Sequence, residues 1–210
     1  MLIFSQQSLA FIAVPKTGTT AVEMALKPKA DILFTKRYKH MTARRFHTKI
    51  APFLQQALNL QPDRIAVMRD PEEQIRSWYR YRTRDAKMDS DKSTGMMSFD
   101  EFVLAVISDD PPPFAGIGSQ LNMLTSGKGA VLVHHLFAYE AQPQFRGFLN
   151  DRFGQDIVLK PKNVSPETHA PLSPATRTKL RAARAGEFDL YNRVLDADGD
   201  LKIPIGKGSE

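Results

Sequence analysis

The chain has 210 residues, of which 42% are hydrophobic and 25% are charged. These proportions are those of an ordinary globular protein, and they exclude a disordered chain, a collagen-like repeat and a coiled coil. Cysteine is absent, which excludes disulfide scaffolds, thiolate metal sites and cysteine nucleophiles. The length fits one domain covering residues 1–210.

The basic residues gather in one stretch of the chain. The net charge is +6, and no acidic residue lies between Asp31 and Asp63. This local positive field favours an anionic partner, although a solvated basic helix face is the alternative. Six basic residues fall in the interval, as many as the whole net charge: Lys36, Arg37, Lys39, Arg44, Arg45 and Lys49.

The sequence contains no pattern typical of a membrane segment. No apolar run approaches the roughly 20 residues that cross a bilayer. Residues 1–14 lack the positively charged start and the small-residue cleavage site of a signal peptide. We therefore expect no membrane span and a cytoplasmic location.

Apolar runs and helix-start signals predict the elements of the first half. Short apolar runs predict buried strands, and Asp70, followed by Pro71 and Glu73, marks the start of a helix. Strands are expected at 2–4, 9–14 and 64–68, and helices at 21–26 and from Gln74 to about Arg84.

The second half continues the alternation of strands and helices. Ser98 with Glu101 forms a capping-box pattern, and Ser173 before Pro174 marks another helix start. The alternation predicts an α/β fold of three layers, with a central, mostly parallel sheet flanked by helices. Helices are expected at 98–107, 142–153 and 174–195, and strands at 129–133 and 156–159.

The first segment whose residues could bind a ligand is Pro15–Thr20, with the sequence P-K-T-G-T-T, which we call the first loop. It joins a predicted strand to a predicted helix. Gly18 lets the backbone curl, the threonine hydroxyls can donate, and the helix N-terminus attracts an oxyanion. Lys16 adds a full positive charge. The loop therefore predicts an anion site, and the alternative is an ordinary turn with capping threonines.

The first loop is not the P-loop of nucleoside-triphosphate enzymes. That motif places its lysine directly after the last glycine, whereas Lys16 precedes Gly18 here. The acidic run Asp196–Asp200 begins like a calcium loop but has Leu201 at the obligatory glycine position. A magnesium-dependent kinase is therefore disfavoured, and no metal site is expected.

The second loaded segment follows the predicted strand at 64–68. Arg69 offers a planar fork suited to a phosphate, and Ser77 lies two turns into the next helix, where its hydroxyl could donate to the same group. The alternative is structural: Arg69 pairs with Glu72 or Glu73, and Ser77 only fills space.

Together, these segments resemble the sulfotransferases that use 3′-phosphoadenosine 5′-phosphosulfate (PAPS), and most closely the carbohydrate-type family with its bacterial members. The similarity rests on a strand before P-K-T-G-T-T and a second strand before R-D-P-x-x-x-x-x-S-W-Y. It implies a P-loop-like version of the three-layer fold. Weaker similarity covers nearly the whole chain, in segments 38–43, 119–120, 138–140, 162–165 and 187–191.

The resemblance implies roles for individual residues. In this family the first loop holds the 5′-phosphosulfate, and the arginine–serine pair holds the 3′-phosphate. Ala138 departs from the pattern, because many members have arginine before the aromatic–glutamate pair, and no role for Glu140 follows. Residues 85–118 have no assignable similarity and are a candidate region for acceptor specificity. PAPS binding is thus assigned to Lys16, Thr17, Gly18, Thr19, Thr20, Arg69 and Ser77.

The chemistry also needs a cation and a base. Lys16 is expected to stabilise charge on the leaving phosphate oxygen, and a general base must take the proton of the acceptor hydroxyl. His40 matches the family's histidine segment, and nearby positive charge is expected to lower its pKa. His47 and then Glu23 are the reserve candidates.

The sequence thus predicts transfer of a sulfuryl group from PAPS to a hydroxyl of a small molecule or glycan, with a carbohydrate favoured. The product is adenosine 3′,5′-bisphosphate (PAP). Neither a nucleic-acid partner nor a metal is expected. Two alternatives stay open: a small-molecule or nucleotide kinase, and a non-catalytic basic module that binds nucleotides or nucleic acid.

Overall fold

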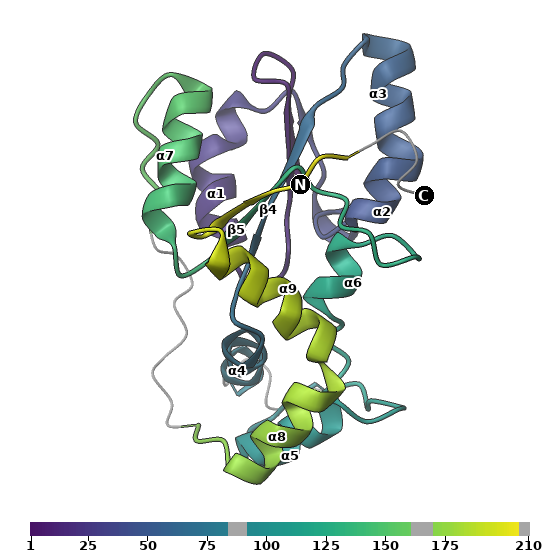
Figure 1. Cartoon of the computed structure of the whole chain (residues 1–210), viewed down its shortest axis with the longest axis vertical. Helices are drawn as coiled ribbons and strands as arrows, with labels where there is room; N and C mark the ends of the chain where they lie inside the picture. Colours follow the sequence, from purple (N-terminus) through teal and green to yellow (C-terminus); the bar gives the residue numbers. More distant parts are fainter. Residues whose placement is uncertain (84–91, 161–169, 206–210) are drawn as a thin grey trace.

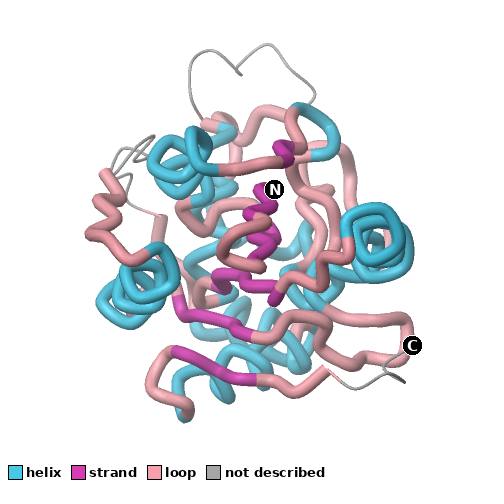
Figure 2. Tube along the Cα trace, turned by 90° about the horizontal axis from the view of Figure 1, so that it is seen from above, coloured by secondary structure: helices cyan, strands magenta, loops and turns pink. Residues whose placement is uncertain are grey.

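A computed structural model describes residues 1–83, 92–160 and 170–205. Its strands form one six-stranded sheet in the order β3-β1-β2-β4-β5-β6. Helices lie on both sides of this sheet (Figures 1 and 2). The strands are β1 (Leu2–Phe4), β2 (Leu9–Ile12), β3 (Ile32–Leu33), β4 (Asp63–Met68), β5 (His135–Ala138) and β6 (Asp200–Lys202).

The α/β class is confirmed, but the prediction of a mostly parallel sheet is wrong. Only the pairs β2–β4 and β4–β5 are parallel, whereas β1–β2, β1–β3 and β5–β6 are antiparallel. The tight turn between Phe4 and Leu9 cannot make a crossover, so β1 and β2 form a hairpin. The three central strands remain parallel, and their carboxyl ends meet at one edge.

Two hydrophobic clusters lie on the two faces of the sheet. On one face, α1 (Thr19–Leu26) and α7 (Gln142–Phe153) cover Phe11 and its neighbours on the strands. The opposite face packs against α2 (Ala43–Arg45), α3 (Ala51–Leu58), α6 (Gln120–Leu124) and α9 (Ala185–Asp196). Three short helices lie between these elements: η1 (Lys27–Lys29), η2 (Lys36–Tyr38) and the π-helix η3 (Phe46–Ile50).

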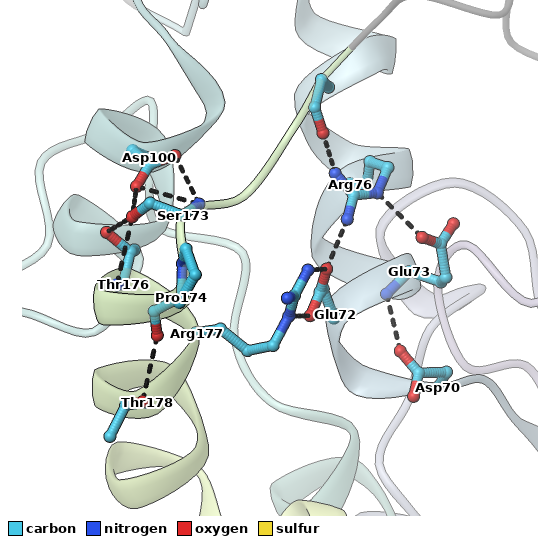
Figure 3. Close-up of polar contacts among 11 residues, drawn as sticks. Asp70, Glu72, Glu73, Arg76, Asp100, Ser173, Pro174, Thr176, Arg177 and Thr178 are labelled. Atoms are coloured by element: carbon cyan, nitrogen blue, oxygen red, sulfur yellow. Dashed lines mark hydrogen bonds and ion pairs between the residues drawn. The ribbon is translucent and has the colours of Figure 1, made fainter.

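A third hydrophobic cluster lies beyond the carboxyl ends of the strands. It joins α4 (Pro71–Arg82), α5 (Phe99–Val106) and α8 (Pro174–Ala183) (Figure 1). Figure 3 shows Glu72 of α4 between Arg76 and Arg177, with the Arg177 Nε 2.8 Å from its carboxylate. The hydrogen bond from Arg177 lowers the pKa of Glu72. These ion pairs fasten α8 to α4.

Predicted elements with clear capping signals are confirmed. Asp70 and Ser98 both cap helices, and Ser98 with Glu101 forms a complete capping box. The strand predicted at 129–133 is wrong: the Ser126 hydroxyl accepts from two backbone N–H groups and holds a turn there, and only an isolated bridge forms. Nor is 156–159 a strand, because the Asn150 side chain ties this segment to the end of α7.

None of the helices in the described parts of the chain is both long enough and apolar enough to cross a membrane.

Candidate functional site

The first loop presents free backbone donors at the start of α1. Gly18 is the N-cap residue, with φ of +76°, and no side chain caps the helix. The N–H groups of Gly18, Thr19 and Thr20 have no acceptor within the described chain. The Thr17 hydroxyl is buried and donates to the Val14 carbonyl at 2.9 Å. The alternative of threonines that cap the helix is therefore wrong, and the loop keeps donors for an anion.

The Lys16 ammonium lies against two aromatic side chains of α4. The backbone of Lys16 has φ of +68°, a strained conformation for a residue with a side chain. Its Nζ lies 4.3 Å from the ring centroid of Tyr81 and 5.4 Å from that of Trp78, which are cation–π distances. The Gln74 side chain also donates to the Pro15 carbonyl at 3.3 Å. The first loop and α4 are thus in direct contact.

Arg69 lies at the carboxyl end of β4, and its guanidinium is loosely held. The group lies 4.7 Å from the Tyr139 ring centroid. A terminal nitrogen is 3.6 Å from a Glu73 oxygen, and the buried Nε makes no hydrogen bond. The Glu73 pairing of the structural alternative is therefore present. Ser77 is half-buried one turn beyond Glu73, and no hydrogen bond joins it to Arg69 among the described contacts.

Tyr139 connects the loops that follow β2, β4 and β5. Its backbone N–H donates to Met68 at 2.7 Å, so it lies beside the end of β4. A Cβ atom added to Gly18 would lie 3.1 Å from the Tyr139 ring. The Arg69 guanidinium lies over the same ring. Gly18 and Arg69, the glycine and the arginine of the two predicted phosphate sites, therefore meet on one aromatic ring, which sequence reasoning did not identify.

Glu140 has a definite structural partner set. It accepts a hydrogen bond from the Tyr191 hydroxyl at 2.7 Å and one from the Asp70 backbone at 3.3 Å. Burial raises the pKa of Tyr191, and the hydrogen bond to Glu140 raises it further. A carboxylate oxygen of Glu140 lies 3.9 Å from the Arg69 Nε. Glu140 therefore lies beside Arg69, a contact that the sequence did not predict.

A buried amide fixes the backbone of Arg69. The Gln120 side chain accepts from the Arg69 N–H and donates to the Arg69 carbonyl, both at 2.9 Å. Gln120 in turn donates to Glu187 at 3.2 Å, and the Ser119 hydroxyl donates to Glu187 at 2.6 Å. The sequence marked these residues only through a weak resemblance, because no local pattern predicts a contact across 51 residues.

His40 is held through one of its ring nitrogens. Its Nδ1 lies 2.7 Å from the carbonyl oxygen of Ala13, the residue before Val14 and the first loop. A carbonyl only accepts, so Nδ1 carries the proton and Nε2 keeps a lone pair in the neutral ring. Desolvation on the side of the ring that faces the protein lowers the pKa of His40, although the residue as a whole is exposed, and the Lys39 charge lowers it further against the bond to Ala13. The direction agrees with the prediction, although desolvation is the larger cause.

The two reserve bases are both engaged. Glu23, in α1, accepts a hydrogen bond from the Lys39 ammonium at 2.8 Å. His47 lies 2.8 Å from an Arg64 guanidinium nitrogen, and because that group only donates, the His47 Nδ1 accepts. Arg64 is near the start of β4, about 13 Å along the strand from its carboxyl end. His47 is therefore at the far end of β4 from Arg69.

The adjacent histidines His134 and His135 contact different partners: the His134 ring accepts a hydrogen bond from the Arg64 backbone N–H, and the His135 ring lies against the Asp200 carboxylate. In the described ranges, no three His, Asp or Glu side chains are arranged to hold a metal ion. The similar segment 162–165 lies outside the described residues, as do residues 85–91 of the region 85–118.

The chain was compared with known families, curated proteins and solved structures, and none of them matches it. The candidate site thus depends on its own geometry and on the motif resemblance. That geometry is a set of cations and free backbone N–H groups at one edge of the sheet. It is suited to an anion with two separated charged groups.

Proposed function

We propose that this protein is a PAPS-dependent sulfotransferase with a P-loop-like core, which transfers a sulfuryl group to a hydroxyl of a carbohydrate or a small molecule. The observation that best supports this proposal is that Gly18 and the Arg69 guanidinium both lie against the Tyr139 ring. It brings together one loop with free N–H donors and one arginine. These are the two kinds of group that a donor with a 5′-phosphosulfate and a 3′-phosphate needs.

Donor binding would divide between the two loops. The phosphosulfate would accept hydrogen bonds from the N–H groups of Gly18, Thr19 and Thr20 at the positive end of α1. The 3′-phosphate would take the fork of Arg69 and the hydroxyl of Ser77. Arg69 has an unsatisfied Nε and long contacts to its carboxylates, so a phosphate can compete for it.

The transfer step would be an in-line displacement at sulfur. The acceptor oxygen forms a bond to sulfur while the bond from sulfur to the bridging phosphate oxygen breaks. That oxygen keeps the electron pair and leaves as part of PAP, and the acceptor proton passes to His40 Nε2. Lys16 would leave the Trp78 and Tyr81 rings to stabilise the charge on the leaving oxygen, where a cation favours the transition state.

Two alternatives keep a physical basis. A small-molecule or nucleotide kinase would use the same loop-to-helix turn for a phosphate. A non-catalytic nucleotide or nucleic-acid module would use the basic interval between Asp31 and Asp63 without chemistry. The pairing of Arg69 with Glu73 and Glu140 also supports a purely structural role for that arginine.

A thermal-shift panel separates these functions. PAP should raise the melting temperature without added metal and by more than ATP, AMP or NADP, because a ligand bound only to the folded state stabilises it. A larger shift with ATP and magnesium would establish the kinase reading instead. No shift with any nucleotide, with steep salt-dependent binding of single-stranded DNA, would establish the nucleic-acid module. Arg146→Gln, on the exposed side of α7, is the control variant for nonspecific charge loss.

A further inference from the structure

A hollow of about 600 Å³ lies beside α2, and two of its lining residues, Tyr38 and Met41, flank His40 in the sequence. Its size falls within the range of small-molecule sites. None of its lining residues belongs to the first loop or to α4. Figure 1 shows α2 and α3 along one flank of the sheet and α4 beyond the carboxyl ends of the strands. We call this the basic hollow, lined by Phe34, Tyr38, Met41, Thr42, Arg44, Arg45, Thr48, Lys49 and Ile50.

In the part of the chain that the structure describes, no carboxylate pairs with the cations of the basic hollow. Arg44, Arg45 and Lys49 line it, whereas none of its lining residues is a carboxylate. Within residues 1–83, 92–160 and 170–205, none of these three has a carboxylate oxygen within 4 Å. Elsewhere, five arginines do have one: Arg69, Arg76, Arg152, Arg177 and Arg184.

This contrast gives the basic hollow an uncompensated positive field. Within the described ranges no carboxylate forms an ion pair with these cations, and in the sequence no acidic residue lies between Asp31 and Asp63. A concave surface of one charge sign concentrates ions of the opposite sign. Two guanidinium forks and an ammonium offer several donors to a group with three terminal oxygens, such as a phosphate or sulfate ester.

Apart from Thr42 and Thr48, the other side chains of the basic hollow are apolar or aromatic. Met41 is buried, and Phe34 and Ile50 pack against the core cluster of this face. Tyr38 has 38% of its surface exposed, and the Arg45 guanidinium lies 5.5 Å from its ring centroid. A bare inorganic ion bound here would leave this apolar surface uncovered. The lining therefore fits an anion attached to a ring or another apolar body.

We propose that the basic hollow is a second ligand site, which binds a small organic phosphate or sulfate monoester with an apolar body. The charged ester lies against Arg44, Arg45 and Lys49, and the body contacts Tyr38 and Met41. This site shares no lining residue with the loops that follow β2 and β4. The inference does not require sulfuryl transfer, so it stands or falls separately from the proposed function.

Calorimetric titration of the full chain with four probes tests the site: 2-naphthyl phosphate, 2-naphthyl sulfate, 2-naphthol and inorganic phosphate. The two esters should bind, and 2-naphthol and inorganic phosphate should bind at least about tenfold more weakly. Arg44→Gln and Arg45→Gln should each weaken ester binding by about tenfold or more, because each removes a charge-assisted contact. Arg146→Gln should leave it unchanged, since Arg146 is exposed on the opposite face of the sheet.

Arg69→Ala separates this site from the candidate nucleotide site. It should preserve binding of the naphthyl esters, and Arg45→Gln should preserve the thermal shift with PAP. The proposal is overturned if neither ester binds the wild-type protein, or if Arg146→Gln or Arg69→Ala weakens the esters as much as Arg45→Gln does. Tight, steeply salt-dependent binding of single-stranded DNA without ester binding would show that this face is a nucleic-acid surface instead.

Discussion

The side-chain amide of Gln120 forms two hydrogen bonds with the backbone of Arg69, accepting from its N–H and donating to its carbonyl, both at 2.9 Å. The two residues are 51 positions apart, and Gln120 is only 1% exposed. A buried amide in this arrangement fixes the direction in which the chain leaves β4. It therefore links the stability of this part of the fold to the position of the Arg69 side chain.

Replacing Gln120 with Leu should lower both stability and PAP affinity. The change leaves the N–H and the carbonyl of Arg69 without their partner, which costs roughly 1–3 kcal/mol for each buried group that stays unsatisfied. Urea unfolding measures the stability, and calorimetric titration with PAP measures the affinity. Gln144→Leu, on α7, is a matched control, because the oxygen of this amide has no hydrogen-bond partner. Unchanged stability in Gln120→Leu would contradict the buried contact.

The candidate 3′-phosphate site predicts a graded loss of PAP affinity. Arg69→Ala should remove a charge-assisted contact worth roughly 1.5–3 kcal/mol and weaken PAP by about one to two orders of magnitude. Ser77→Ala should cost less, because its hydroxyl is neutral. Both losses should shrink for AMP, which lacks the 3′-phosphate. Equal losses for PAP and AMP would show that Arg69 does not contact that group.

Gly18 can be tested against a glycine in the same backbone conformation. Gly18 and Gly154 both have positive φ, +76° and +62°, so alanine at either position should cost about 1–2 kcal/mol of stability. Only the Gly18 Cβ would meet Tyr139, at 3.1 Å, whereas the Gly154 Cβ would meet nothing within 4 Å. Urea unfolding should therefore show a loss for both variants, and only Gly18→Ala should weaken PAP binding. Equal PAP affinity in the two variants would separate Tyr139 from the site.

The local parts of this structure were predictable, and the long-range parts were not. Asp70 and Ser98 could be recognised as helix caps because capping involves residues only three apart. The run 129–133 has the composition of a strand, but the Ser126 side chain stabilises a turn that composition does not reveal. The antiparallel β6 pairs with a strand some 65 residues earlier, so no local pattern could predict it.

The same division applies to the candidate site. Both loops could be located because parallel strands bring their carboxyl ends to one edge of the sheet. The contacts that place Arg69 come from Tyr139, Glu140 and Gln120, which lie on other elements. A motif predicts which residues face a ligand, whereas these supporting contacts depend on how distant elements pack.

Stability should decline as the pH falls below about 6.5. Desolvation lowers the pKa values of the half-buried His134 and, with more solvent screening, of the exposed His40 below the usual 6.5, so at these two sites the unfolded chain binds more protons than the folded protein in this range. The stabilisation from these two histidines is complete well above pH 6.5 and is lost as the pH falls through their folded-state pKa values. Protonation of His134 also removes the acceptor of the Arg64 N–H, at 2.8 Å.

Urea unfolding between pH 8 and pH 5.5 measures this dependence. His134→Gln should flatten it, because a neutral amide can accept the same hydrogen bond without titrating. The carboxylates with lowered pKa values, such as Glu72, lose their contribution only below the usual 4.5, so they do not affect this range. An unchanged slope in His134→Gln would exclude this histidine as a source.

The proposed catalytic groups should differ in what their loss does to binding and to rate. Lys16→Ala should lower both PAPS affinity and transfer, because Lys16 is assigned to the donor and its leaving oxygen. His40→Ala should leave the thermal shift with PAP nearly intact and reduce transfer by about 10²–10⁴, the usual range for loss of a general base. Release of PAP from PAPS, measured with a panel of saccharide and phenol acceptors, gives the rate. The wild-type rate should rise with pH through the pKa of His40, which lies below its usual 6.5, and then reach a plateau.

A His40→Ala variant that binds PAP and still transfers at nearly the wild-type rate would remove His40 as the base. Glu23 would then be the next residue to replace. It lies in α1, the helix that follows the first loop, and its carboxylate is 2.8 Å from the Lys39 ammonium, whereas His47 is at the far end of β4.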